Sequence, residues 1–227
     1  QKNLVPEKQA IDVLKQIETS LQSEQMDFSN VIRTWFYNQN ITSWYKEFNL
    51  VRNNFFQQRD IFSRLVPAST AVGLNNGAKT ALVGGTLAVQ GKSEDIRVFS
   101  LPSPLQGSAM KYGSSFSRAV ELVLPDHRRL YISGTASIDS NGKTVYPNDA
   151  PFQVRRSMEV TDAILKSCKM DWSEITRAIA YFKNAEDIML LDEYCRMNQL
   201  PSFPVIITKR DICRDDLLFE IEVDAIN

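Results

Sequence analysis

Histidine and cysteine, which supply many metal ligands and nucleophiles, are scarce in this sequence. Its 227 residues include three cysteines and one histidine. Cys168, Cys195 and Cys213 are odd in number and lack CxxC spacing, which indicates reduced thiols in a cytoplasmic protein rather than a disulfide framework. His127 lies in an expected turn, where histidine is more often solvated than catalytic. We therefore expect no metal site, no cofactor and no Ser-His-Asp triad.

An excess of charge and long apolar runs are also missing. The 26 basic and 27 acidic residues give a net charge of −1, so no basic field would attract nucleic acid or an anionic membrane. No apolar run approaches the roughly 18–20 residues that span a bilayer, and residues 1–6 do not resemble a signal peptide. Gly84-Gly85 is not part of a GxGxxG phosphate loop. We expect a cytoplasmic protein whose partner is neither nucleic acid nor membrane.

The last predicted strand, residues 217–225, carries the clearest pattern in the chain. From Phe219 to Ala225 apolar residues alternate with Glu220, Glu222 and Asp224, so one face is apolar and the other acidic. The apolar face is the one expected to be covered by helices. The acidic face has two interpretations: a surface open to solvent, or a site where one carboxyl has a raised pKa and transfers a proton.

The chain contains an internal duplication. Met26-Asp27-Phe28-Ser29-Asn30-Val31-Ile32-Arg33 aligns with Met170-Asp171-Trp172-Ser173-Glu174-Ile175-Thr176-Arg177 at a constant offset of 144 residues. Both segments lie between a predicted helix and a predicted strand, and both are followed by a helix and two strands. Gly84-Gly85 stands roughly where the second copy has Glu220-Ile221, so the acidic row occurs once. One site per chain at the junction of the two copies is therefore expected.

The duplication predicts two domains. The first, residues 1–98, lacks the opening hairpin that the second has, and is therefore expected to be truncated at its N-terminus. Residues 99–112 show neither a helical nor a strand period and are interpreted as a linker, so the second domain covers residues 113–227. Its second hairpin strand contains five small residues, 133–137, which favour close approach of a ligand or of another backbone.

The arginines make a small anionic ligand plausible. Arg33, on a predicted strand, either binds a carboxylate or forms a structural ion pair, and Arg177 is its equivalent in the second copy. Arg52 lies on a predicted helix, where we expect it to be solvated. Arg118 precedes a hairpin strand, and Arg214 precedes the acidic strand. No spacing among them selects one anion.

Several stretches resemble the chorismatases, a family with two YjgF/Rid-like domains. They span nearly the whole chain and are Val31–Trp35, Tyr45–Phe48 with Arg52, Pro67–Gly73, Tyr112-Gly113, Ser115–Ala119, Ser133–Ser137 and Cys213–Glu222. The resemblance implies an α+β fold of two tandem Rid-like domains, of the type also called chorismate-mutase-like or ferredoxin-like, with the site near their junction. Chorismatases are longer at the N-terminus, in agreement with the missing hairpin.

The resemblance also implies an activity and a set of site residues. Chorismatases cleave the enolpyruvyl ether of chorismate to pyruvate and a hydroxylated cyclohexadiene carboxylate or a hydroxybenzoate, and Glu220 matches their proton donor. The residues expected to bind the substrate are Arg33, Tyr112, Arg118, Ala136 and Arg214.

Two other functions stay open at this point. One is a non-catalytic Rid-like module that binds a small molecule or another protein. The other is an enamine/imine deaminase of the Rid type. Those deaminases bind the substrate carboxylate with an arginine shortly after a proline, and no arginine follows Pro204 here, which counts against this activity. The resemblance allows a monomer or a homo-oligomer through the Rid-like domains.

Overall fold

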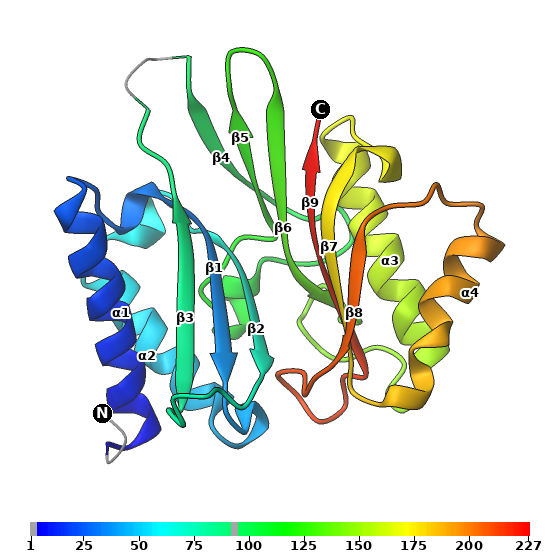
Figure 1. The fold of residues 1–227 in the computed structure, drawn as a ribbon, viewed down its shortest axis with the longest axis horizontal. Coiled ribbons are helices and arrows are strands. Elements are labelled where there is room, and N and C mark those ends of the chain that lie inside the picture. The colour runs from blue at the N-terminus through cyan, green and yellow to red at the C-terminus, as the bar shows by residue number, and fades with distance from the viewer. Residues whose placement is uncertain (1–3, 92–94) are drawn as a thin grey trace.

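The computed structural model describes residues 4–91 and 95–227. It contains two β-sheets with helices on their outer sides (Figure 1). The elements in chain order are α1 (Pro6–Ser23), β1 (Val31–Asn38), α2 (Tyr45–Gln57), β2 (Ala68–Gly73), β3 (Leu82–Ala88), β4 (Arg97–Leu101), β5 (Ala119–Val123), β6 (Arg128–Ala136), α3 (Ala150–Ser167), β7 (Ile175–Phe182), α4 (Met189–Met197), β8 (Val205–Lys209) and β9 (Phe219–Ile226). None of the helices among the described residues combines the length and apolar character that a membrane span requires.

The first sheet has the strand order β2-β1-β3. Strand β1 pairs in parallel with β2 and antiparallel with β3. Helices α1 and α2 cover one face, where Leu14 and Phe48 pack with Phe36 of β1 in one buried cluster. The apolar residues of α1 and α2 recur every three or four positions, so each helix buries one stripe against the sheet.

The second sheet has the order β4-β5-β6-β9-β7-β8. Strand β7 pairs in parallel with β8 and antiparallel with β9, which repeats the pairing of β1. Asp27 and Asp171 each cap a short 3-10 helix that leads into these strands, and both form a capping box. The duplication inferred from the sequence is thus confirmed in topology and in local structure, as is the α+β class.

The expected linker contains a strand. Arg97–Leu101 forms β4 and pairs antiparallel with β5 at the edge of the second sheet. Residues 97 and 98 therefore belong to the second sheet and not to the end of the first domain, and residues 99–101 are not linker. An edge strand pairs on one side only and buries little, so it needs no clear alternation of apolar and polar residues. For this reason residues 97–101 show no strand pattern.

The two sheets meet where β2 lies against β6. Ser117 N donates to the carbonyl of Pro67 at 2.9 Å, and Ser69 N donates to Ser133 Oγ at 2.8 Å. Ile32 of β1 contributes to a further buried cluster with residues of β5 and β6. The run of small residues at 133–137 therefore lies, as predicted, where another backbone approaches closely.

Candidate active site

The acidic face of β9 points toward the first sheet and is buried there. Phe219, Ile221 and Val223 pack with the helices of the second sheet, as expected. On the opposite face Glu220 is 5% exposed and Glu222 is fully buried. The interpretation of this face as open to solvent is therefore wrong, because the first sheet covers it.

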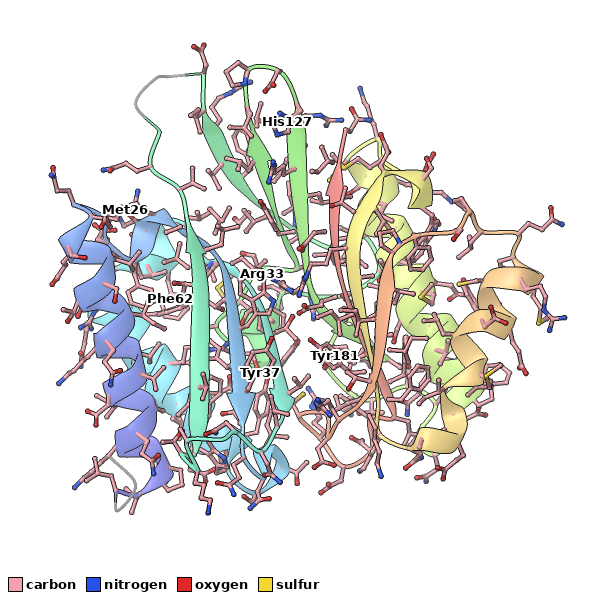
Figure 2. The ribbon with its side chains drawn as sticks, viewed as in Figure 1. Met26, Arg33, Tyr37, Phe62, His127 and Tyr181 are labelled. Carbon is pink, nitrogen blue, oxygen red and sulfur yellow. The ribbon has the colours of Figure 1, made fainter. Side chains whose placement is uncertain are left out.

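Glu222 is held by donors from both sheets. Its carboxylate accepts hydrogen bonds from Arg33 at 2.7 Å, from Trp35 Nε1 at 3.2 Å and from Arg177. Burial alone would raise the pKa of Glu222, but Arg33, a hydrogen bond from Thr70 and Arg177 outweigh it and lower that pKa. Figure 2 shows Arg33 between the two sheets. Of the two interpretations of Arg33, the structure supports the ion pair, and Arg33 does not line the pocket described below.

Glu220, two residues before Glu222, has a different environment. No side chain in residues 4–91 or 95–227 donates a hydrogen bond to its carboxyl at normal distance. Burial, together with the charge of Glu222, raises the pKa of Glu220 to about 8, although Arg33 acts in the opposite sense. The carboxyl fits because β6 shifts register between Ile132 and Thr135 and because residue 134 is glycine: a Cβ there would overlap Glu220 Oε1. Glu220 is therefore a carboxylic acid near neutral pH.

Glu220 forms part of the wall of a pocket between the two copies. The empty volume, including the mouth, is about 480 Å³. The lining residues come from both halves of the chain and are Tyr45, Arg52, Ser69, Ala71, Tyr112, Phe116, Arg118, Gly134, Ala136, Ile138, Cys213, Arg214, Leu217 and Glu220. Of the predicted site residues, Glu220, Tyr112, Arg118, Ala136 and Arg214 thus lie in one pocket.

Arg52 lines this pocket and was wrongly expected to be solvated. It is 1% exposed, and it donates hydrogen bonds to Asn49 Oδ1 at 2.7 Å and to Ser69 Oγ at 3.2 Å. Its Nε has no hydrogen-bond partner among the residues that the structure describes. The reason is its place on α2: position 52 follows Phe48 by four residues and precedes Phe55 by three, so it lies on the buried stripe of the helix. That spacing was the signal in the sequence that could have identified it.

Two further guanidinium groups face the pocket. Arg118 donates to the carbonyl of Gly107 at 2.9 and 2.8 Å and to Tyr112 Oη at 2.9 Å, and Arg214 donates to the carbonyl of Gly142 at 2.6 Å. The ring of Tyr112 lies 5.6 Å from the guanidinium carbon of Arg118 and 5.7 Å from that of Arg214. Arginines and aromatic rings therefore alternate along this wall.

The three arginines of the pocket have no acidic partner within the described part of the chain. None of the ion pairs between residues 4–91 and 95–227 includes Arg52, Arg118 or Arg214. Burial lowers the pKa of both Arg52 and Arg118. Buried positive charge without a carboxylate is costly, so an anionic ligand bound in this pocket would stabilise it.

The rest of the lining includes an apolar part. Ala136, Ile138 and Leu217 belong to one buried cluster, against which Tyr112 and Cys213 pack. Burial, aided by the charge of Glu220, raises the pKa of the Cys213 thiol to about 12, so it stays protonated. The sequence did not single out Cys213, Tyr45, Ser69 or Phe116 as lining residues, although each lies within a stretch that resembles the chorismatases.

The structure offers few metal ligands. Among the described residues no group of three or more His, Cys, Asp or Glu side chains could hold a metal ion. His127 lies in the turn between β5 and β6 (Figure 2) and does not line the pocket. It forms a hydrogen bond with Asp126 at 2.7 Å.

Comparison with known proteins identifies relatives of similar sequence. No protein-family model matches the chain. A curated chorismatase of Streptomyces rapamycinicus is 26% identical over 220 residues, which cover 87% of this chain and 64% of the relative. A 3-hydroxybenzoate synthase of Streptomyces hygroscopicus is 23% identical over 223 residues, with 88% and 64% coverage. This chain therefore spans less than two thirds of the length of these relatives.

A solved structure extends the comparison to the fold. The crystal structure of a chorismatase superposes with a TM-score of 0.78 at 21% sequence identity and covers 95% of this chain and 69% of its own. The resemblance that the sequence motifs predicted is thereby confirmed: the chain has the fold of the chorismatases and matches curated chorismatases in sequence along most of its length.

Proposed function

We propose that the chain converts chorismate, cleaving its enolpyruvyl ether to pyruvate and a hydroxylated cyclohexadiene carboxylate or a hydroxybenzoate. The observation that carries this proposal is the pairing of one buried carboxylic acid, Glu220, with three guanidinium groups that have no acidic partner among the described residues. The names of the relatives, chorismatase and 3-hydroxybenzoate synthase, support the same substrate.

The pocket suits an aromatic-sized dianion. Chorismate carries two carboxylates, one on the ring and one on the enolpyruvyl group, and arginine binds a carboxylate through two parallel hydrogen bonds. We assign the two carboxylates to Arg52 on one side and to Arg118 with Arg214 on the other. The ring would lie against the apolar side chains of Ala136 and Ile138, and the small side chain of Ala136 leaves room for it.

Glu220 would act as the general acid. Its carboxyl donates its proton to the methylene carbon of the enolpyruvyl group, and the electrons of the carbon–carbon double bond form the new C–H bond. The ether carbon becomes an oxocarbenium centre, which water or a ring hydroxyl attacks. Attack by water gives a hemiketal, whose hydroxyl passes its proton to the ring oxygen as the carbon–oxygen bond breaks and pyruvate leaves. Attack by a ring hydroxyl gives a cyclic ketal, which a water molecule then opens before pyruvate leaves in the same way. In both cases the proton lost by the attacking hydroxyl restores the acid. A pKa of about 8 keeps the proton on Glu220 at neutral pH.

A coupled assay tests the proposal. Pyruvate released from chorismate is reduced by lactate dehydrogenase, and the loss of NADH is followed for the wild type and for Glu220→Gln. We expect release by the wild type and at least about a hundredfold loss in the variant, with product chromatography identifying the ring product. Full activity of Glu220→Gln would refute the mechanism. Chorismate binding without pyruvate would favour a binding module, and ammonia from 2-iminobutyrate would favour a deaminase.

A further inference from the structure

A network of buried hydrogen bonds lies behind the pocket and takes no part in the mechanism above. Arg33 Nη2 donates to Glu222 Oε2 at 2.7 Å and to Thr70 Oγ1 at 2.8 Å. Thr70 Oγ1 in turn accepts a hydrogen bond from the backbone N–H of Gly134 at 3.1 Å. The chain of contacts therefore begins at Glu222 and ends at Gly134, the residue against which the carboxyl of Glu220 lies.

The network crosses from one sheet to the other. Arg33 and Thr70 belong to the first sheet, on β1 and β2, while Glu222 and Gly134 belong to the second, on β9 and β6. Arg33 also donates to the carbonyl of Ile132 at 3.0 Å, just before the register shift in β6. The backbone that makes room for Glu220 is thus fixed by side chains of the other copy.

Glu222 places a permanent negative charge beside Glu220. Both lie on one face of β9, two residues apart, and Glu222 is fully buried between guanidinium groups that keep it ionised. A negative charge on Glu220 would be repelled by the charge of Glu222. Among the described residues no cationic side chain contacts the Glu220 carboxyl and could offset this repulsion.

We propose that Glu222, Arg33 and Thr70 are positioning residues that hold the Glu220 carboxyl against Gly134, directed into the pocket and in its acid form. This inference rests on the proposed function, because it concerns the proton donor of that reaction. It assigns a task to Arg33 other than binding the substrate.

Other titratable and charged groups also surround Glu220. On its own sheet they are Glu222 and Tyr181, and from the first sheet Arg33. Across the pocket they are Arg52, Arg118 and Arg214. The thiol of Cys213 and the phenols of Tyr45 and Tyr112 keep their protons, because burial raises the pKa of each. Of the groups in this set, Glu222 carries the negative charge near neutral pH.

The first test replaces the charge. Glu222→Gln should lower the pH at which Glu220 loses its proton by roughly one unit, a tenfold change in its ionisation constant. The carbonyl stretch of a protonated carboxyl, present in the wild type and absent in Glu220→Gln, reports this titration by infrared spectroscopy. The upper limit of the pH profile of pyruvate release should move by the same amount.

Asp224→Asn is the matched control. Asp224 lies on the same face of β9 and pairs with Arg177 at 3.0 Å, but no hydrogen bond or ion pair among the described residues joins it to Arg33 or Thr70, and Arg33 acts on it only through its charge. Its replacement should leave the titration of Glu220 within about 0.3 pH units of the wild type. An equal shift in both variants, or no shift in Glu222→Gln, would overturn the proposal.

Glu222→Gln also removes the carboxylate that pairs with two guanidinium groups, those of Arg33 and Arg177. A second test therefore leaves all charges in place. Thr70→Val removes the hydroxyl that links Arg33 to Gly134 at nearly constant volume. We expect kcat to fall about tenfold with KM within twofold of the wild type, and Thr70→Ser to restore most of kcat. A rise in KM with unchanged kcat, or equal losses in the Val and Ser variants, would contradict a positioning role. If the wild type releases no pyruvate, the proposed function fails, whereas the infrared titration still decides whether the network acts on Glu220.

Discussion

Glu220→Gln should stabilise the folded protein, and should do so only above acidic pH. Burial and the charge of Glu222 raise the pKa of Glu220 from 4.5 to about 8. Below pH 4.5 the folded and unfolded chains both carry the proton, so the raised pKa has no effect there. Between pH 4.5 and 8 only the unfolded chain ionises, and each pH unit costs the folded state about 1.4 kcal/mol. Above pH 8 the penalty is constant at up to about 5 kcal/mol.

Glutamine has the shape of glutamic acid but cannot ionise, so it escapes this penalty. We expect the free energy of unfolding of Glu220→Gln to equal that of the wild type within about 0.5 kcal/mol at pH 4, and to exceed it by about 2–5 kcal/mol at pH 8.5. Urea unfolding followed by circular dichroism at several pH values measures this difference.

A matched control separates this effect from a general effect of removing charge. Glu193→Gln, at an exposed position of α4, should show no such dependence on pH. A difference between Glu220→Gln and wild type that stays constant from pH 4 to 8.5, or a variant less stable than wild type at pH 8.5, would refute the view that Glu220 is a neutral acid in the folded state.

Three further predictions follow from the site. Under the proposed function, kcat should fall tenfold per pH unit above about pH 8, because Glu220 then loses the proton that it donates; a rate that rises through this range would exclude it as the acid. Gly134→Ala should lower kcat at least about a hundredfold, because the added Cβ would overlap Glu220 Oε1. The control is Gly85→Ala, which should keep kcat within about twofold, because nothing lies within 4 Å of a Cβ added there. Arg52→Met should raise KM for chorismate about 10–100-fold. Because it removes a buried charge that has no acidic partner among the described residues, it should also raise the free energy of unfolding by about 1–3 kcal/mol. An unchanged KM would show that Arg52 is not part of the binding site.

The position of a residue on its own element was readable from the sequence. Alternation along 219–225 placed Phe219 on the core side of β9 and Glu220 on the other, because successive side chains of a strand point to opposite faces. The repeat at an offset of 144 residues revealed two copies of one topology, since both copies keep the capping aspartate that precedes β1 in the first and β7 in the second.

What lies against each face was not readable, and the arginines show why. Arg33 was expected to bind the substrate, but it forms an ion pair with Glu222. Arg52 was expected to be solvated, but it lines the pocket. A guanidinium group can bind an anionic ligand only if no carboxylate of the protein is free to pair with it. The carboxylates that could do so come from segments far away in the chain. Arg33 is separated from Glu222 by 189 residues.

The α+β class, the duplication and the orientation of the acidic row could therefore be inferred without a structure, as could, through the resemblance to the chorismatases, the identity of Glu220 as the candidate acid. All of these depend on local periodicity or on motifs that stay contiguous in the chain. Four features became visible only in the folded chain: the acidic face is buried, β4 joins the second sheet, Arg52 lines the pocket, and Glu220 and Glu222 differ in protonation. These depend on which groups from the other copy exclude water and supply charge, and therefore on how the two sheets pack together.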